Sequence, residues 1–94
     1  MEFLIRHEFN FPDGVDREKV ISEERARVAE LARDGKALRI WRDPLQSATW
    51  SLWNFKDVDE LQSVFSALPA FPYFQNITVR ALGRHPADPG KAHG

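Results

Sequence analysis

Hydrophobic and polar positions alternate from residue 2 to residue 10. Phe3, Ile5, His7 and Phe9 lie on one side of this segment, and mostly polar residues lie on the other. This period of two is typical of a strand with one buried face, because successive side chains of a strand point to opposite sides. The N-terminal segment is therefore predicted to be a β-strand.

Residues 16–34 follow a helical pattern instead. Asp16 is suited to the N-terminal cap, and Gly35 follows the last residue that fits the pattern. An aspartate side chain accepts a hydrogen bond from the free N–H groups of a first turn, and glycine readily adopts the left-handed conformation that ends many helices. A helix is predicted between these two residues.

One acidic residue of this helix lies where an apolar residue is expected. At about 100° per residue, Val20, Val28 and Leu31 form one apolar stripe. Glu24 falls within this stripe, whereas its neighbour Glu23 points into the charged arc. Two interpretations of Glu24 are open. Its carboxylate either reaches the edge of the core or pairs with an arginine across an interface, or it lines a functional pocket.

The remainder of the chain predicts three more strands and one more helix. The strands are expected at residues 36–43, 47–55 and 76–84, and the helix at residues 57–68. Pro44 lies in the tight connection between the second and third strands, and Pro69 ends the second helix. This order predicts an α+β fold of the ferredoxin-like βαββαβ type, in which a four-stranded antiparallel sheet carries both helices on one face.

The uncovered face of the sheet and the C-terminal end have consequences for assembly. Aromatic or long apolar side chains must lie on the second face whichever parity the strands adopt, so another subunit is expected to cover it. A homo-oligomer is therefore expected, either a dimer or a multiple of dimers. Residues 1–86 are expected to form a single domain, and residues 87–94 a tail or an arm that contacts a neighbouring subunit.

Composition narrows the classes of function. The 94 residues are 43% hydrophobic, which is enough for one packed core. The 13 basic residues balance 14 acidic ones without forming a basic block, which argues against nucleic-acid binding. No segment has the apolar length of a transmembrane helix or the apolar core of a signal peptide, so a cytoplasmic protein without membrane contact is expected.

Metal and thiol chemistry are not indicated by the sequence. The chain has no cysteine, so a disulfide, a thiolate nucleophile and a cysteine-ligated metal are excluded. His7, His85 and His93 lack the spacing of a metal-binding motif, and no metal site is expected.

Several motifs are similar to those of a known family. They are Trp41 and Arg42 before the hairpin, the glutamate-bearing helix EERARVAELARDGK, the turn LPAFPYF and the closing RHP. In this order they cover nearly the whole chain, which resembles the muconolactone isomerase family. The resemblance implies a ferredoxin-like fold, dimers assembled into a larger ring-like oligomer such as a decamer, no cofactor, and a proton shift within an unsaturated lactone from aromatic degradation. Chloromuconolactone dehalogenases share this scaffold, so the resemblance does not fix the reaction.

The resemblance also implies a set of site residues. The position of the family's catalytic carboxylate is taken by Glu24, and its substrate-binding positions by Arg42, Arg84 and His85. The hairpin departs from the family pattern, because Ser47 and Thr49 stand where a tyrosine and an asparagine typically point into the site. Since both residues are smaller, a substrate bulkier than muconolactone, or differently functionalised, is expected.

A carboxylate in an apolar pocket suits this chemistry. Desolvation raises the pKa of a buried carboxyl group toward neutrality, so Glu24 can remove a proton from carbon and return it at the other end of an allylic system. Arg42, or the hydroxyl groups of Ser47 and Thr49, would stabilise the oxyanion of the dienolate. An arginine would also hold a substrate carboxylate, and the sequence does not divide these two roles between Arg42 and Arg84.

Three other functions are compatible with the same sequence. A dehalogenase or lyase would expel a leaving group after the same deprotonation and needs no further residue. A non-catalytic oligomer that binds a small ligand is favoured by the departures at Ser47 and Thr49. A cofactor-independent oxygenase on the same fold would carry no distinguishing motif.

Overall fold

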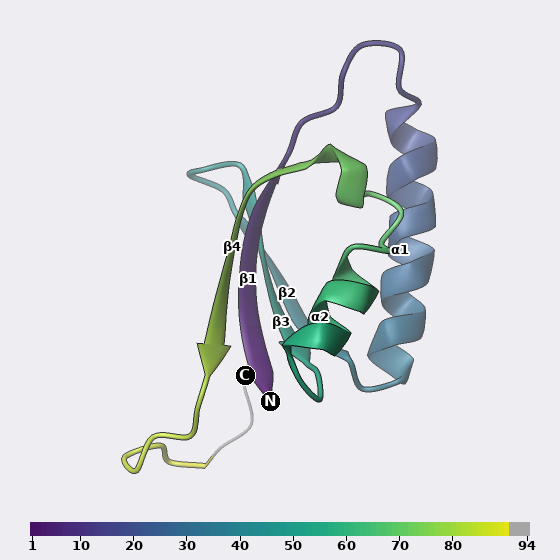
Figure 1. Ribbon diagram of the computed structural model, residues 1–94. Coiled ribbons are helices and arrows are strands. Elements are labelled where there is room, and N and C mark those ends of the chain that lie inside the picture. The colour runs from purple at the N-terminus through teal and green to yellow at the C-terminus, as the bar shows by residue number, and fades with distance from the viewer. Residues whose placement is uncertain (91–94) are drawn as a thin grey trace.

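The computed structural model describes residues 1–90, which form a two-layer α+β fold (Figure 1). Its elements are β1 Glu2–Phe9, α1 Arg17–Arg33, β2 Ala37–Asp43, β3 Ala48–Asn54, α2 Val58–Phe65, the 3-10 turn η1 Phe71–Tyr73 and β4 Phe74–Leu82. The strands form one antiparallel sheet in the spatial order β2-β3-β1-β4, and both helices lie on the same face of it. The predicted ferredoxin-like fold is confirmed.

The predicted boundaries of α1 are confirmed together with their causes. The side chain of Asp16 accepts a hydrogen bond of 3.1 Å from the backbone nitrogen of Lys19 and so caps the first turn. The helix ends at Arg33, and Gly35 follows with φ +76°, a conformation that costs glycine little. The two residues fix where α1 begins and ends, and with it the position of Glu24.

The predicted C-terminal end of α2 was three residues too late. The helix ends at Phe65, and the backbone then tightens, with the nitrogen of Leu68 donating to the carbonyl of Phe65 at 3.2 Å. The cause is Pro69, which disfavours the helical conformation of the residue before it. The last strand begins at Phe74, two residues earlier than expected, because the aromatic turn runs directly into it.

The core lies between the sheet and the helices. β1 alternates as predicted, with Phe3, Ile5 and His7 buried beneath the helix layer. The rings of Trp53 and Phe55 stack 5.6 Å apart in the same layer. The buried cluster consists of Phe3, Ile5, Leu31, Ala37, Trp53, Phe55, Leu61, Phe65 and Leu68.

The opposite face of the sheet carries a row of large side chains without a covering layer. Arg6, Trp50 and Trp41 are cross-strand neighbours on β1, β3 and β2, and Trp41 is 38% exposed. On the helix-covered face, an apolar groove of about 520 Å³ opens between α2 and β4, where Ile77 and Val79 are exposed. Both surfaces therefore leave large apolar side chains partly exposed, as is common at surfaces that bind a partner.

The segment after β4 leaves the sheet and lies away from the helix layer (Figure 1). Residues 83–90 are exposed, and one turn is closed by a 2.9 Å hydrogen bond from the backbone nitrogen of Asp88 to the carbonyl of His85. The predicted arm is described only up to residue 90. Residues 91–94, including His93, lie outside the described residues. In the described part, no helix combines the length and hydropathy that a membrane span requires.

Candidate active site

An open cleft of about 1200 Å³ lies between α1 and the sheet. Four of the residues singled out by the sequence line it: Glu24 from α1, Arg42 from β2, and Ser47 and Thr49 from the β2–β3 hairpin. These residues are separated by up to 25 positions in the chain, and the fold brings them to one cavity. The site is therefore built from one helix above and one end of the sheet below.

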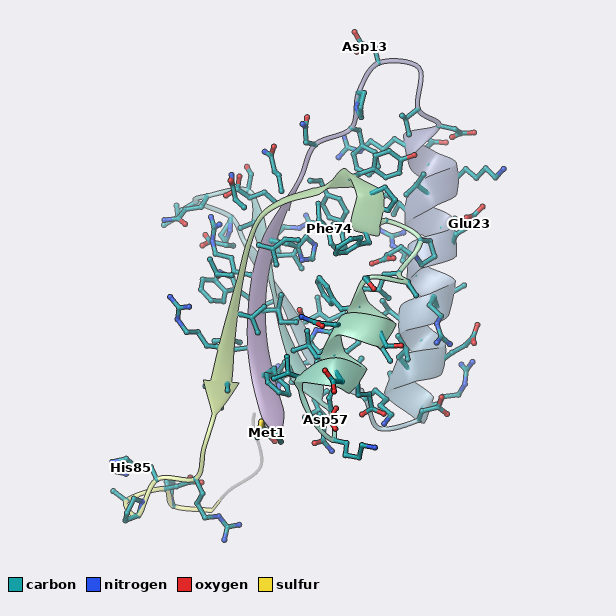
Figure 2. The ribbon with its side chains drawn as sticks, viewed as in Figure 1. Met1, Asp13, Glu23, Asp57, Phe74 and His85 are labelled. Atoms are coloured by element: carbon teal, nitrogen blue, oxygen red, sulfur yellow. The ribbon has the colours of Figure 1, made fainter. Side chains whose placement is uncertain are left out.

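Glu24 lies on the face of α1 that packs toward the sheet. Its side chain is partly buried, and its Oε1 accepts a 3.0 Å hydrogen bond from the backbone nitrogen of Ala70. Burial raises the pKa of this carboxyl group above its ordinary value, and the hydrogen bond from Ala70 opposes that shift in part. Glu23 is exposed on the outer side of α1 (Figure 2). The predicted difference between the two neighbours is confirmed.

No cationic group neutralises Glu24 within residues 1–90. Ion pairs in this part of the chain join Arg6 to Glu8, Arg27 to Glu30 and Lys36 to Glu60, and none of these involves Glu24. An ion pair would lower the pKa of Glu24, whereas its surroundings raise it. Within residues 1–90, Glu24 is thus a desolvated carboxylate without a structural counter-charge.

The wall opposite Glu24 is a polar row that crosses three strands. Thr49 of β3 is paired with His7 of β1 on one side and with Arg42 of β2 on the other. Directly opposed residues of an antiparallel sheet have Cβ atoms about 5 Å apart and point to the same face. His7, Thr49 and Arg42 therefore present an imidazole, a hydroxyl and a guanidinium group side by side to the helix-covered face.

Ser47 sits at the rim of the cleft because of the hairpin geometry. The loop between the strands spans residues 44–47, and the carboxylate of Asp43 accepts hydrogen bonds from the backbone nitrogens of Leu45 and Gln46 at 3.0 and 3.2 Å. Ser47 closes the loop with φ +51°, a left-handed conformation that a small residue tolerates. Its hydroxyl lies in an exposed position beside the more enclosed Thr49.

Among the polar residues that the sheet contributes to the cleft, Ser51 and His7 were not predicted as site residues. Ser51 accepts a 2.8 Å hydrogen bond from Nε1 of Trp53, and both are buried in the cleft wall. His7 lies on the apolar side of the strand that the sequence predicts, and it was not predicted to belong to a site. Its signal was the same as that of Glu24, a titratable side chain on an apolar face, but its partner Thr49 follows only from the strand register.

Arg84 and His85 do not join this cleft in their own chain. Both are exposed beyond the end of β4, and His85 lies far from the helix layer in Figure 2. The side chain of His85 accepts a 3.0 Å hydrogen bond from the backbone nitrogen of Ala87, which shapes the local turn. The role of Arg84 and His85 in substrate binding therefore stays a prediction, because these residues lie away from the Glu24 cleft of their own chain.

The described residues do not form a metal centre. Among residues 1–90, no group of three or more histidine, aspartate or glutamate side chains is placed to hold a metal ion.

The fold and the cleft place the chain in a class of small ferredoxin-like proteins with a desolvated carboxylate on the first helix. The family model of muconolactone delta-isomerase matches residues 1–88, and the chain belongs to this family. Muconolactone Delta-isomerase of Rhodococcus opacus is 35% identical over 89 residues, covering 92% of this chain and 95% of that protein.

A second relative and a solved structure agree with this assignment. Muconolactone Delta-isomerase of Acinetobacter baylyi is 33% identical over 90 residues, which are 93% of each chain. The crystal structure of a muconolactone isomerase matches this fold with a TM-score of 0.85 at 26% sequence identity, covering 98% of each chain. The similarity therefore extends over the whole fold, including the helix that carries Glu24.

Proposed function

We propose that this protein is a cofactor-independent isomerase that shifts a carbon–carbon double bond in a small unsaturated lactone or a related carbonyl compound, with Glu24 as the base. The observation that carries the proposal is the partly buried carboxylate of Glu24, which faces the cleft without a counter-charge in residues 1–90. Membership of the muconolactone delta-isomerase family supports the same reaction class.

The reaction needs one base that acts twice. Ionised Glu24 takes a proton from the carbon at one end of the allylic system, which breaks a C–H bond and forms the carboxylic acid. The electron pair of the broken C–H bond moves into the conjugated system and places negative charge on the carbonyl oxygen of the lactone. Glu24 then returns a proton to the other end, so the net change is a moved double bond.

The environment of Glu24 suits both steps. Burial raises the pKa of the carboxyl group, which makes its ionised form a stronger base and keeps its acid form a competent donor. The hydrogen bond from Ala70 holds Oε1 and limits rotation of the carboxylate. A base fixed in this way loses little entropy when it reaches the substrate carbon.

The opposite wall would stabilise the dienolate. Thr49 offers a hydroxyl donor in the middle of the polar row, and Ser47 offers another at the rim. Arg42 carries an exposed guanidinium at the outer end of the row, where it would hold a substrate carboxylate or the oxyanion. One preorganised donor to an oxyanion is worth about 3 to 4 kcal/mol in similar sites.

The substrate is proposed to be bulkier than muconolactone. Ser47 and Thr49 have short side chains, and the cleft beside them is wide and open in the single chain. A site that lacks long polar groups on this wall gains room but loses reach toward a small substrate.

We further propose that the working enzyme is a homo-oligomer in the cytoplasm, built from dimers, as in a decamer. The uncovered row with Trp41 and Trp50 and the apolar groove along β4 are surfaces that a second subunit would bury. The segment after β4 would then carry Arg84 and His85 to the cleft of a neighbouring subunit.

The test is proton exchange into a panel of unsaturated lactones in deuterated water, followed by NMR. The panel contains muconolactone, larger alkyl- and aryl-substituted butenolides, and analogues with a halide at the site of protonation. Wild-type protein is expected to isomerise at least one lactone and to introduce deuterium at carbon. Halide release without isomerisation would instead identify a lyase, and an inactive wild type across the panel would contradict the proposal.

A further inference from the structure

His7 is a buried histidine whose hydrogen-bonding groups have no partner. Its side chain is 5% exposed, and neither Nδ1 nor Nε2 forms a hydrogen bond with any group in residues 1–90. An unpaired buried polar group destabilises the folded state, so buried nitrogens without a partner need an explanation. An apolar residue of the same size would avoid this cost and continue the apolar side of β1.

The surroundings of His7 hold its ring in place without using its nitrogens. The ring stacks on Phe74 with centroids 3.9 Å apart and an interplanar angle of 25°. Phe9 approaches it edge-on at 5.1 Å, and Phe65 does so at 6.3 Å. Burial lowers the pKa of the imidazole from 6.5 to about 4, so the ring is neutral near pH 7, with one N–H donor.

The same ring belongs to the wall of the Glu24 cleft. His7 lines the cavity together with Glu24, and it is the direct cross-strand neighbour of Thr49. The turn LPAFPYF, residues 68–74, connects the two titratable groups, because it contacts Glu24 through the N–H of Ala70 and His7 through the ring of Phe74. The turn thus fixes a base and an imidazole toward one cavity.

The strand next to His7 is irregular at this level. β4 contains a β-bulge opposite His7, since Arg6 pairs with Thr78 but Glu8 pairs with Gln75. Asn76 within the bulge has φ +52°. Bulges change the direction of neighbouring side chains and occur often beside active sites. The pairing on the β3 side, between His7 and Thr49, remains regular.

We propose that His7 contacts the substrate in the Glu24 cleft and donates a hydrogen bond to the lactone carbonyl oxygen as negative charge develops there. The ring nitrogens are covered in the empty cleft, so the atoms of His7 that now face the cavity are others. A half-turn about the Cβ–Cγ bond exchanges Nδ1 with Cδ2 and Nε2 with Cε1 within the same envelope. The two nitrogens thus take the places of the ring carbons without a change in packing, and in the proposed complex this half-turn turns one nitrogen toward the substrate.

This role complements the short hydroxyl side chain beside it. His7 reaches further from the sheet than Thr49, and a neutral imidazole keeps its proton while donating, so the base remains Glu24 alone. The inference rests on the proposed lactone isomerisation. Within the polar row, His7 would be the most deeply buried donor, and hydrogen bonds to an oxyanion are strongest where water is excluded.

Two variants of His7 test this role. His7→Leu keeps an apolar side chain of similar size and removes the donor, whereas His7→Gln keeps an N–H donor of similar reach. His7→Leu is expected to lower kcat/KM by about 10² for a lactone that the wild type isomerises, with an unchanged or higher thermal midpoint. His7→Gln is expected to retain clearly more activity than His7→Leu. The proposal would be overturned if the wild type is active and folded His7→Leu is equally active. It would also be overturned if both folded variants lose activity to the same extent.

A second measurement covers the case in which the variants fail to fold. The ¹⁵N resonances of the His7 ring are followed in wild-type protein while the product of that isomerisation is added to saturation. A shift of one ring nitrogen toward a hydrogen-bonded value is expected, and unchanged resonances would overturn the role of His7. If the wild type isomerises no lactone, or if Glu24→Gln stays active, the proposed function itself fails and this inference with it.

Discussion

Oε1 of Glu24 lies 3.0 Å from the backbone nitrogen of Ala70, so the first helix is tied to the turn before the last strand. Ala70 is fully buried, and Glu24 supplies the acceptor that its N–H group requires. The same hydrogen bond fixes one oxygen of a carboxylate whose pKa burial has raised. One contact therefore serves the fold and prepares a base.

Activity should be lost in acid as Glu24 becomes protonated. Only the ionised carboxylate removes a proton from carbon, and burial places its pKa above the ordinary 4.5. We expect kcat/KM to fall about tenfold per pH unit below this raised pKa. A pH profile of kcat/KM for the lactone that the wild type turns over reports this pKa. An acidic midpoint of the profile at or below 4.5 would show that the base is not desolvated.

Protonation of Glu24 has the opposite effect on stability. The unfolded chain ionises at the lower pKa, so stability is lost as the pH rises from the unfolded value through the raised folded value. Glu24→Gln keeps an acceptor for Ala70 and removes the buried charge. Its thermal midpoint should exceed that of the wild type at neutral pH, and the difference should vanish in acid.

His7 should destabilise the protein in acid. Its folded pKa of about 4 lies below the unfolded value of 6.5, so the unfolded chain binds the proton first. Stability should be full above pH 6.5 and should fall by about 3 kcal/mol toward pH 4, given 1.4 kcal/mol per unit. Urea unfolding at several pH values measures this loss. The His7→Leu variant should lack this loss of stability, whereas the His85→Leu variant, which changes an exposed histidine, should retain it. A loss that is unchanged in His7→Leu would show that another group causes it.

The sequence predicted Glu24 but not His7, and the reason is the range of the signal. The angle of Glu24 on α1 depends only on residues within three turns, so periodicity finds it. The partnership of His7 with Thr49 joins residues 42 positions apart, and only the strand register defines it. In the sequence, His7 only continues the alternating side of the strand that carries Phe3 and Ile5, and this pattern does not distinguish it from a core residue.

The fold was predictable because its elements are defined by patterns of nearby residues. The errors of the prediction concerned where single elements end. Caps and alternation marked β1 and α1, whereas the end of α2 depended on how Pro69 tightens the chain after Phe65. The placement of Arg84 and His85 could not follow from local pattern, because they lie beyond the last strand. Their proposed role depends on another subunit.

Restoring longer polar side chains to the hairpin should redirect the substrate preference. The double variant Ser47→Tyr with Thr49→Asn adds two long polar groups to the wall opposite Glu24. We expect wild type to turn over muconolactone poorly and the double variant to improve its kcat/KM by about tenfold or more, at the expense of bulkier lactones. Efficient isomerisation of muconolactone by the wild type would contradict the role of these two positions.

The protein should assemble through its uncovered surfaces and its C-terminal arm. Light scattering at micromolar concentration should give a dimer or a multiple of dimers, and a mass near 10.8 kDa would contradict this. Deleting residues 87–94 should lower both the oligomer size and the thermal midpoint. Trp41→Glu places a charge on the uncovered face and should weaken the assembly independently of the arm. A truncated protein with unchanged size and midpoint would show that the arm is dispensable.

The most direct test of the mechanism compares two adjacent glutamates of α1. Glu24→Gln and Glu23→Gln make the same change in charge, but only Glu24 lines the cleft. The measurement is kcat/KM for deuterium incorporation and isomerisation of the lactone that the wild type turns over. Glu24→Gln is expected to lose about 10³-fold or more, and Glu23→Gln to stay within about twofold of wild type. A folded Glu24→Gln that keeps wild-type kcat/KM would contradict Glu24 as the base.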